Sequence, residues 1–170
     1  MNIVSIIKVL NELKRKRKLK DYAIFGAIGA SYYMEPIFTK DIDVLVLADT
    51  DEDYIRVWRE LSKHAEKTKD FGFVIDQTEV QILPTSIHPM FKSALESAKS
   101  VKTGGITTKV VDREHLILMF LRANRQKDRF KASILLAKAN QPYLEKLLRR
   151  FDTNGTLRSR LKTLGKSAQS

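Results

Sequence analysis

The feature that most constrains the fold is an apolar segment over residues 41–47 that begins with two carboxylates, Asp41 and Asp43. Side chains alternate between the two faces of a β-strand, so both carboxylates lie on one face while Ile42 and Val44 lie on the other. Two residues of strand rise separate the carboxylates by about 6–7 Å, which lets both reach one metal ion or a pair of metal ions. Because an unpaired buried charge is costly, the pair indicates either a metal site or a solvated strand end.

A turn of small residues precedes this strand. Residues 22–25 are a short apolar strand, and Gly26 then starts a helix that runs through Tyr33 and is ended by Pro36, because the residue before a proline is disfavoured in helical geometry. A glycine turn followed by a strand with two carboxylates favours the metal site over the solvated strand end.

Composition restricts the class of protein. With 170 residues, the chain is long enough for one domain with its own hydrophobic core. No apolar run reaches the roughly 18 residues of a membrane span, and the N-terminus lacks the order of a signal peptide. We therefore expect no membrane interaction and a cytoplasmic location. The absence of cysteine excludes disulfides, zinc–thiolate sites and a cysteine nucleophile.

Positive charge is concentrated in the C-terminal third of the chain. The net charge is +11, yet residues 1–112 hold 17 Lys and Arg against 16 Asp and Glu, whereas residues 113–170 hold 14 against 4. Such a cationic surface is typical of proteins that bind polyphosphates or nucleic acids. The basic run over residues 14–18 also has a structural explanation, because cations at the C-terminal end of a helix complement its dipole.

Hydrophobic periodicity predicts an α/β (α+β) fold, in which a small mixed β-sheet is flanked by helices and followed by a helical C-terminal third. Helices are predicted over residues 2–18, 26–33, 51–67, 91–98 and, from the N-cap Asp112, up to Phe151 with breaks near Gln126 and Pro142; strands are predicted over residues 22–25, 41–47, 71–75, 79–83 and 107–111. We expect residues 1–111 to form the core, residues 112–155 to form a helical part packed on it, and residues 156–170 to form a basic, flexible tail.

The order of these motifs resembles the nucleotidyltransferase superfamily: an apolar strand, a glycine followed by a small residue, a spacer of 13 residues between Ala27 and Asp41, and then Asp-x-Asp. More closely, the chain resembles AbiEii-like nucleotidyltransferases, a group that includes toxins of toxin–antitoxin systems. The segments that carry this resemblance are residues 26–28, 33–36, 39–44, 80–84, 112–117 and 125–129. The resemblance covers about residues 22–150 and implies the minimal nucleotidyltransferase fold.

The resemblance also implies the roles of individual residues. In this family the glycine turn, here Gly26 and Ala27, receives the nucleoside triphosphate. Asp41 and Asp43 would hold Mg²⁺ or Mn²⁺, hard cations that prefer carboxylate and phosphate oxygens. Lys127 would contact a phosphate, and Asp128 would bind a neighbouring basic side chain. The full set of implied nucleotide-binding residues is Gly26, Ala27, Thr39, Lys40, Arg125, Lys127 and Asp128.

The third acidic position of the family carries an amide in this chain. Active members usually supply another carboxylate from the neighbouring strand, between two apolar residues, and Gln81 is the residue that fits this pattern. An amide can bind a metal or orient a water molecule, but it cannot act as a base. Glu79, two residues earlier on the same face, is the alternative for that role. The candidate catalytic set is therefore Asp41, Asp43, Gln81 and Glu79.

Two functions remain open at this point. The first is a magnesium-dependent enzyme that transfers a nucleotidyl group from a nucleoside triphosphate to an acceptor, with RNA favoured by the basic C-terminal third. The second is a non-catalytic module of the same fold that binds nucleotide, nucleic acid or a protein partner such as a cognate antitoxin. The intact carboxylate pair favours the enzyme, whereas Gln81 and Ala27 favour the module.

Overall fold

The structure is a computed structural model that describes residues 2–69 and 72–167. Its helices are α1 (Ile3–Arg15), α2 (Gly26–Ala30), α3 (Asp51–Ser62), α4 (Pro89–Glu96), α5 (Arg113–Ala123), α6 (Gln126–Leu136), α7 (Gln141–Phe151) and α8 (Thr156–Ser167), with a 3₁₀-helix η1 (Thr85–Ile87). Its strands are β1 (Tyr22–Phe25), β2 (Asp41–Val46), β3 (Lys67–Lys69), β4 (Gly72–Ile75), β5 (Thr78–Pro84), β6 (Lys99–Thr103) and β7 (Ile106–Val110).

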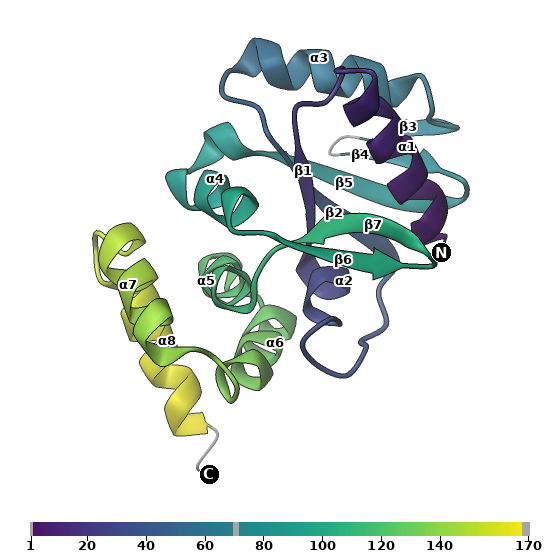
Figure 1. The fold of residues 1–170 in the computed structure, drawn as a ribbon. Helices are drawn as coiled ribbons and strands as arrows, with labels where there is room; N and C mark the ends of the chain where they lie inside the picture. Colours follow the sequence, from purple (N-terminus) through teal and green to yellow (C-terminus); the bar gives the residue numbers. More distant parts are fainter. Residues whose placement is uncertain (1, 70–71, 168–170) are drawn as a thin grey trace.

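The strands form one mixed sheet in the order β3-β4-β5-β2-β1-β7-β6. Strand β2 is antiparallel to β1 and parallel to β5, and β1 is parallel to β7. Helices α1 and α3 lie on one side of the sheet and α5 and α6 on the other (Figure 1). The predicted mixed sheet flanked by helices is therefore confirmed.

Alternation along β2 separates two hydrophobic cores. Ile42, Val44 and Val46 pack in the core that includes the buried residues of α1 and α3. Leu45 belongs to the other core, which is built mainly from α4, α5, α6, α7 and α8. Asp41 and Asp43 share the face of Leu45, so both carboxylates lie on the side of the sheet that the C-terminal helices cover.

Local capping explains where the principal helices begin and end. Asp112 accepts a hydrogen bond from the backbone N–H of His115 at 2.9 Å, so it is the predicted N-cap of α5. Helix α5 ends at Asn124, which has a left-handed φ of 55°, and α6 starts two residues later. Asn140 accepts from the N–H of Tyr143 at 3.1 Å and caps α7. The predicted breaks near Gln126 and Pro142 are therefore confirmed.

The expected flexible tail over residues 156–170 is wrong for residues 156–167, which form α8. The carboxylate of Asp152 accepts hydrogen bonds from the backbone N–H groups of Leu157 and Arg158, each at 2.9 Å, and this cap starts the helix. Leu157 and Leu164 are then buried in the core of the C-terminal helices. Residues 168–170 lie outside the described residues.

Other differences concern short or polar segments. Strands β3 and β6 were not expected, because each is short and rich in lysine and threonine without an apolar face. Helices α1 and α3 end at Arg15 and Ser62, earlier than the predicted residues 18 and 67. Phe71, expected in the strand with residues 72–75, lies outside the described residues. No helix in the described part of the chain is long and apolar enough to cross a membrane.

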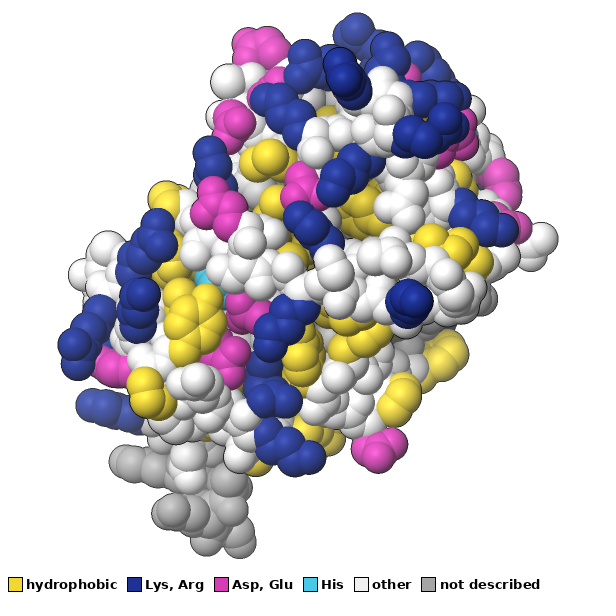
Figure 2. All heavy atoms as spheres, in the orientation of Figure 1, with side chains coloured by type: hydrophobic (Ala, Val, Ile, Leu, Met, Phe, Trp, Pro, Cys, Tyr) yellow, Lys and Arg dark blue, Asp and Glu magenta, His cyan; other side chains and the backbone are white. Residues whose placement is uncertain are grey.

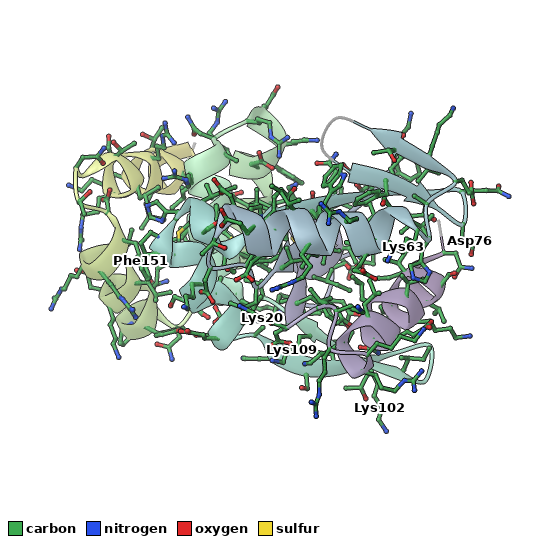
Figure 3. The ribbon with its side chains drawn as sticks, turned by 90° about the horizontal axis from the view of Figure 1, so that it is seen from above. Lys20, Lys63, Asp76, Lys102, Lys109 and Phe151 are labelled. Carbon is green, nitrogen blue, oxygen red and sulfur yellow. The ribbon has the colours of Figure 1, made fainter. Side chains whose placement is uncertain are left out.

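Ion pairs account for part of the N-terminal basic run. The carboxylate of Asp21 lies 2.7 Å from Nζ of Lys14 and 2.5 Å from Nζ of Lys109, and Lys20 pairs with Asp53 at 2.7 Å. Figure 3 shows Lys20 and Lys109 near the middle of the molecule, with Phe151 of α7 and Asp76 of the β4–β5 turn toward opposite ends. Of the lysines in these pairs, only Lys14 belongs to the run over residues 14–18, and Lys16 of the same run pairs with Glu12 at 2.5 Å. Lys14 and Arg15 lie in the last turn of α1, where the helix-dipole explanation places them.

Candidate active site

Strands β2 and β5 bring the predicted acidic residues together. Their parallel register places Asp41 opposite Glu79 and Asp43 opposite Gln81. The side-chain amide of Gln81 donates from Nε2 to Oδ2 of Asp41 at 2.9 Å, and Thr39 donates from Oγ1 to Oδ1 of Asp41 at 2.5 Å. Both oxygens of Asp41 thus have a donor, which fixes the orientation of its carboxylate. The predicted placement of Gln81 beside the carboxylate pair is confirmed.

Gly26 brings the backbone of the turn against Asp43. Strands β1 and β2 pair Phe25 with Asp43, so the turn that follows Phe25 lies directly beside this carboxylate. Gly26 has a φ of +63°, and a β-carbon at this position would lie 1.8 Å from Oδ2 of Asp43. Only glycine avoids both the strain of that backbone conformation and the steric overlap.

A cavity of about 330 Å³ opens over the two carboxylates, a size that suits a small ligand. One wall comes from the turn and the sheet, and the opposite wall comes from the end of α5 and the start of α6. The lining includes the turn residues Gly26 and Ala27 and the polar or charged side chains of Thr39, Asp41, Asp43, Gln81, Arg125, Lys127, Asp128 and Lys131. The apolar side chains in the lining are those of Phe25, Ile37, Phe38, Met119, Phe120 and Ala123.

A buried carboxylate on α6 holds two of the cations. Asp128 is fully buried, and its oxygens accept from Nε of Arg125 at 2.5 Å and from Nζ of Lys131 at 3.1 Å. Burial alone would raise the pKa of the Asp128 carboxyl, but the hydrogen bonds from Arg125 and Lys131 lower it below its ordinary value. Nζ of Lys131 also lies 4.6 Å from the centre of the Phe120 ring. The predicted contact of Asp128 with a neighbouring basic side chain is confirmed.

The second carboxylate of the pair is held in an unfavourable environment. Burial, and then the negative charge of Asp41, raise the pKa of Asp43 to about 6. The positive charges of Lys131, Arg125 and Lys127 act in the opposite direction. The positive side chains nearby therefore do not fully balance the negative charge of Asp41 and Asp43. An added cation is stabilised in such an environment.

Comparisons with known proteins bear on the fold. No family model and no curated protein matches the chain. An antigenic nucleotidyltransferase-like protein from Paracoccidioides brasiliensis superposes with a TM-score of 0.57 at 14% identity, over 92% of this chain and 90% of that one. ANT(2″)-Ia in complex with adenylyl-2″-tobramycin gives a TM-score of 0.57 at 14% identity, over 95% and 99% of the two chains. The chain has the nucleotidyltransferase fold.

Within this nucleotidyltransferase fold, two predicted site residues lie apart from the cavity. Lys40 is exposed, and neither Lys40 nor Glu79 is among the described residues that line the cavity. Alternation along the chain explains why the side chain of Lys40 does not line the cavity: its neighbours Thr39 and Asp41 both do. Glu79 lies opposite Asp41, two register positions before the pair that Gln81 forms with Asp43.

Seven of the lining residues were in neither the predicted catalytic set nor the predicted nucleotide-binding set, and two of them, Lys131 and Phe38, offer a charge and an exposed ring to a ligand. Lys131 follows Asp128 by three residues, a spacing that places both on one side of a helix and that could have identified it. Phe38 lies in the connection between α2 and β2, with 87% of its surface exposed. No periodic pattern covers that connection, so the sequence offered no signal for Phe38.

The donor set fits a divalent metal that also receives ligands from its substrate. Within residues 2–69 and 72–167, no group of three or more His, Cys, Asp or Glu residues could hold a metal ion by itself. Asp41 and Asp43 supply carboxylate oxygens on one side of the cavity, and Mg²⁺ commonly binds through one or two carboxylates together with substrate phosphates. The uncompensated charge of the pair is consistent with such an ion.

Proposed function

We propose that this chain transfers a nucleotidyl group from a nucleoside triphosphate to a hydroxyl acceptor in the cavity above Asp41 and Asp43. One observation carries the proposal: the glycine turn, the carboxylate pair and the cations of α6 line the same cavity. The turn suits phosphate binding, the carboxylates suit metal binding, and the cations suit charge neutralisation. The fold shared with nucleotidyltransferases also supports the proposal of nucleotidyl transfer.

The polar residues of the cavity have complementary roles in this proposal. The absence of a side chain at Gly26 lets a phosphate approach the backbone closely. Lys127 and Lys131 neutralise phosphate charge from the opposite wall, and Asp128 keeps Lys131 in position. Thr39 and Gln81 fix the carboxylate of Asp41 through their hydrogen bonds, so the site is oriented before substrate enters.

Asp41 and Asp43 are the residues that would hold Mg²⁺ or Mn²⁺. With a metal held there, charge on the phosphates would be neutralised and the pKa of the attacking hydroxyl would be lowered. Gln81 cannot accept the proton of the acceptor, since its amide nitrogen already donates to Asp41 and an amide is no base. We therefore propose that transfer proceeds without a protein base at the Gln81 position.

RNA is the acceptor that we favour, because the C-terminal third carries 14 basic residues against 4 acidic ones. A role as the toxin of a toxin–antitoxin pair, with a cognate antitoxin as partner, is part of the proposal and rests on the resemblance to AbiEii-like nucleotidyltransferases. A cytoplasmic location likewise rests on the sequence. The second candidate function is a non-catalytic nucleotide-binding module, which the amide at Gln81 favours.

The experiment that separates these functions follows label from an α-³²P-labelled nucleoside triphosphate into total RNA in the presence of Mg²⁺. We expect the wild-type protein to label RNA and the double variant Asp41→Asn/Asp43→Asn to lose this activity. The matched control is Asp51→Asn/Glu52→Gln, which removes the same charge from two exposed residues of α3. Label that is incorporated equally by all three proteins would contradict the proposed site, and nucleotide binding without incorporation would favour the module.

A further inference from the structure

A second cavity, of about 500 Å³, lies at the opposite end of α5 from the catalytic cavity. It is bounded by the segment after α2, the start of β6, the N-terminal ends of α5 and α7, and the residues that follow α6. The residues that matter for the argument are Tyr33, Lys99, Arg113, Lys138 and Tyr143. Since α5 contributes Arg113 here and Met119 to the catalytic cavity, about 9 Å of helix separates the two.

The acidic side chains around this second cavity are already hydrogen-bonded within the protein. Asp112 is buried and accepts from the backbone N–H and from Nδ1 of His115, at 2.9 and 2.8 Å. Glu114 is also buried, and its Oε1 accepts from the backbone N–H of Asn140 at 2.7 Å. Both carboxylates thus stabilise the helix starts and form no ion pair with Lys99, Arg113 or Lys138 in the described structure.

The cations, in contrast, have unused hydrogen-bonding capacity. Lys99 and Lys138 are exposed, and neither ammonium group has a partner among the described residues. In the view of Figure 2, Lys and Arg side chains lie over α5 and α6 beside acidic and hydrophobic side chains.

Arg113 is the most informative of the three cations. Its guanidinium carbon lies 5.2 Å from the centre of the Tyr33 ring, and Nη1 donates to the carbonyl oxygen of Lys138. These contacts define the orientation that the guanidinium has in the structure. Nε is buried without a hydrogen-bond partner, and Nη2 has none among the described residues. Nε and Nη2 form one edge of the guanidinium, the edge that pairs with both oxygens of a carboxylate or phosphate.

We propose that this cavity binds a small oxyanion ligand, one that carries a phosphate or carboxylate group, on the Nε–Nη2 edge of Arg113 between Lys99 and Lys138. The buried Nε supports this assignment, because a buried polar atom without a partner costs free energy that an oxyanion would recover when Arg113 turns toward it. The cavity volume leaves room for a ligand larger than the anion itself. This site goes beyond nucleotidyl transfer and does not depend on it.

The aromatic residues define the rest of the site. Burial, and then the negative charge of Asp112, raise the pKa of Tyr33 to about 12, so its hydroxyl stays neutral. Tyr143 donates its hydroxyl to Ser97 at 3.4 Å, which fixes the opposite wall. A neutral tyrosine wall next to three cations accommodates an organic anion as well as an inorganic one.

The test is a titration of the ¹⁵N-labelled full chain, carrying Lys127→Gln, which removes an exposed cation from the catalytic cavity and so weakens phosphate binding there. Inorganic phosphate and citrate are added in separate arms at constant ionic strength, and the Nε–Hε resonance of Arg113 is followed. We expect a saturable shift at Arg113 with at least one probe, and the arm that saturates at lower concentration identifies the preferred group. Shifts that grow linearly for both probes, as at the exposed Arg59, would overturn the proposal.

Two variants complete the test. In Arg113→Gln the saturable shifts at backbone amides around the cavity should weaken at least tenfold, whereas Arg59→Gln, the same change on an exposed residue of α3, should leave them unchanged. If Arg113→Gln fails to fold, Lys138→Gln provides the second measurement, because this side chain is exposed. We expect it to weaken binding several-fold, and an unchanged affinity would contradict the site.

Discussion

A β-carbon at Gly26 would lie 1.8 Å from Oδ2 of Asp43, so the turn backbone and the second carboxylate are in direct contact. The contact links the glycine turn, which we propose receives the phosphates, to one of the two carboxylates that we propose hold the metal. It also explains why a glycine precedes the carboxylate pair: any side chain would displace Asp43 from the position that the strand register gives it.

The first prediction concerns this glycine. Gly26→Ala should lower the free energy of unfolding by more than the roughly 1–2 kcal/mol of a left-handed backbone, because the methyl group also displaces Asp43, and it should reduce nucleotidyl transfer at least tenfold. The control is Gly105→Ala, which has a φ of +80° but no atom within 4 Å of the added carbon. Denaturant unfolding and transfer rates check both variants. Equal effects of the two substitutions would contradict the proposed contact.

The second prediction is the pH dependence of stability that Asp43 imposes. Its folded pKa of about 6 lies above the ordinary 3.8, so between these values the folded state binds more protons than the unfolded state and stability falls as pH rises. At pH values well above 6, the folded state carries the full free-energy cost of an ionised Asp43. Asp43→Asn should therefore be more stable than wild type by about 1–3 kcal/mol at pH 7.5 without metal, and should show no gain near pH 3.5.

Denaturant unfolding at the two pH values measures this difference, with Glu52→Gln as a control for the loss of an exposed charge. Saturating Mg²⁺ should stabilise the wild type and reduce the advantage of Asp43→Asn. A variant that is less stable than wild type at pH 7.5 would show that Asp43 has a structural role instead.

The third prediction addresses the missing third carboxylate. Gln81→Asp should raise Mg²⁺ affinity or transfer rate, because it adds a stronger metal ligand and a base beside Asp41. Glu79→Gln should change the rate by less than about threefold, since Glu79 is not among the described lining residues. Calorimetric Mg²⁺ titrations and single-turnover rates provide the measurements. A loss of about 10² on Glu79→Gln, typical of a general base, would instead assign that role to Glu79.

The fourth prediction concerns Phe38, which lines the cavity yet is 87% exposed. An exposed aromatic ring beside a nucleotide site can stack on the base, and such contacts contribute about 1–3 kcal/mol. Phe38→Ala should therefore weaken nucleoside triphosphate binding about 5- to 150-fold without changing the free energy of unfolding. Ile87→Ala, an equally conservative truncation of an exposed residue in η1, should change neither quantity. Unchanged affinity of Phe38→Ala would remove Phe38 from the site.

The sequence predicts the acidic side of the site well, because strand alternation alone determines which face each residue occupies. Asp41 and Asp43 could be placed together from spacing, and Gln81 from the motif of a neighbouring strand; the register confirms both. The cationic wall was harder to predict. In α6, Ala132 and Leu135 are buried while Phe130 and Ile134 are exposed, so no single apolar stripe indicates which side faces the cavity.

Helix α8 shows a second limit of prediction from the sequence. Asn154 and Gly155 indicate the end of a structured region, and the residues after them are mostly polar. The helix forms because Asp152 caps it and because α8 buries leucines against the other C-terminal helices. Such tertiary contacts are not encoded in local propensity.

The most direct test of the central claim compares nucleoside triphosphates labelled at the α- or the γ-phosphorus, with Mg²⁺ and total RNA. Nucleotidyl transfer forms a bond between the acceptor oxygen and the α-phosphorus and releases pyrophosphate. We predict that α-label appears on RNA while γ-label appears only in pyrophosphate, and that both signals are lost in Asp41→Asn/Asp43→Asn. Transfer of γ-label to the acceptor, or α-label incorporation that survives in the double variant, would contradict the account.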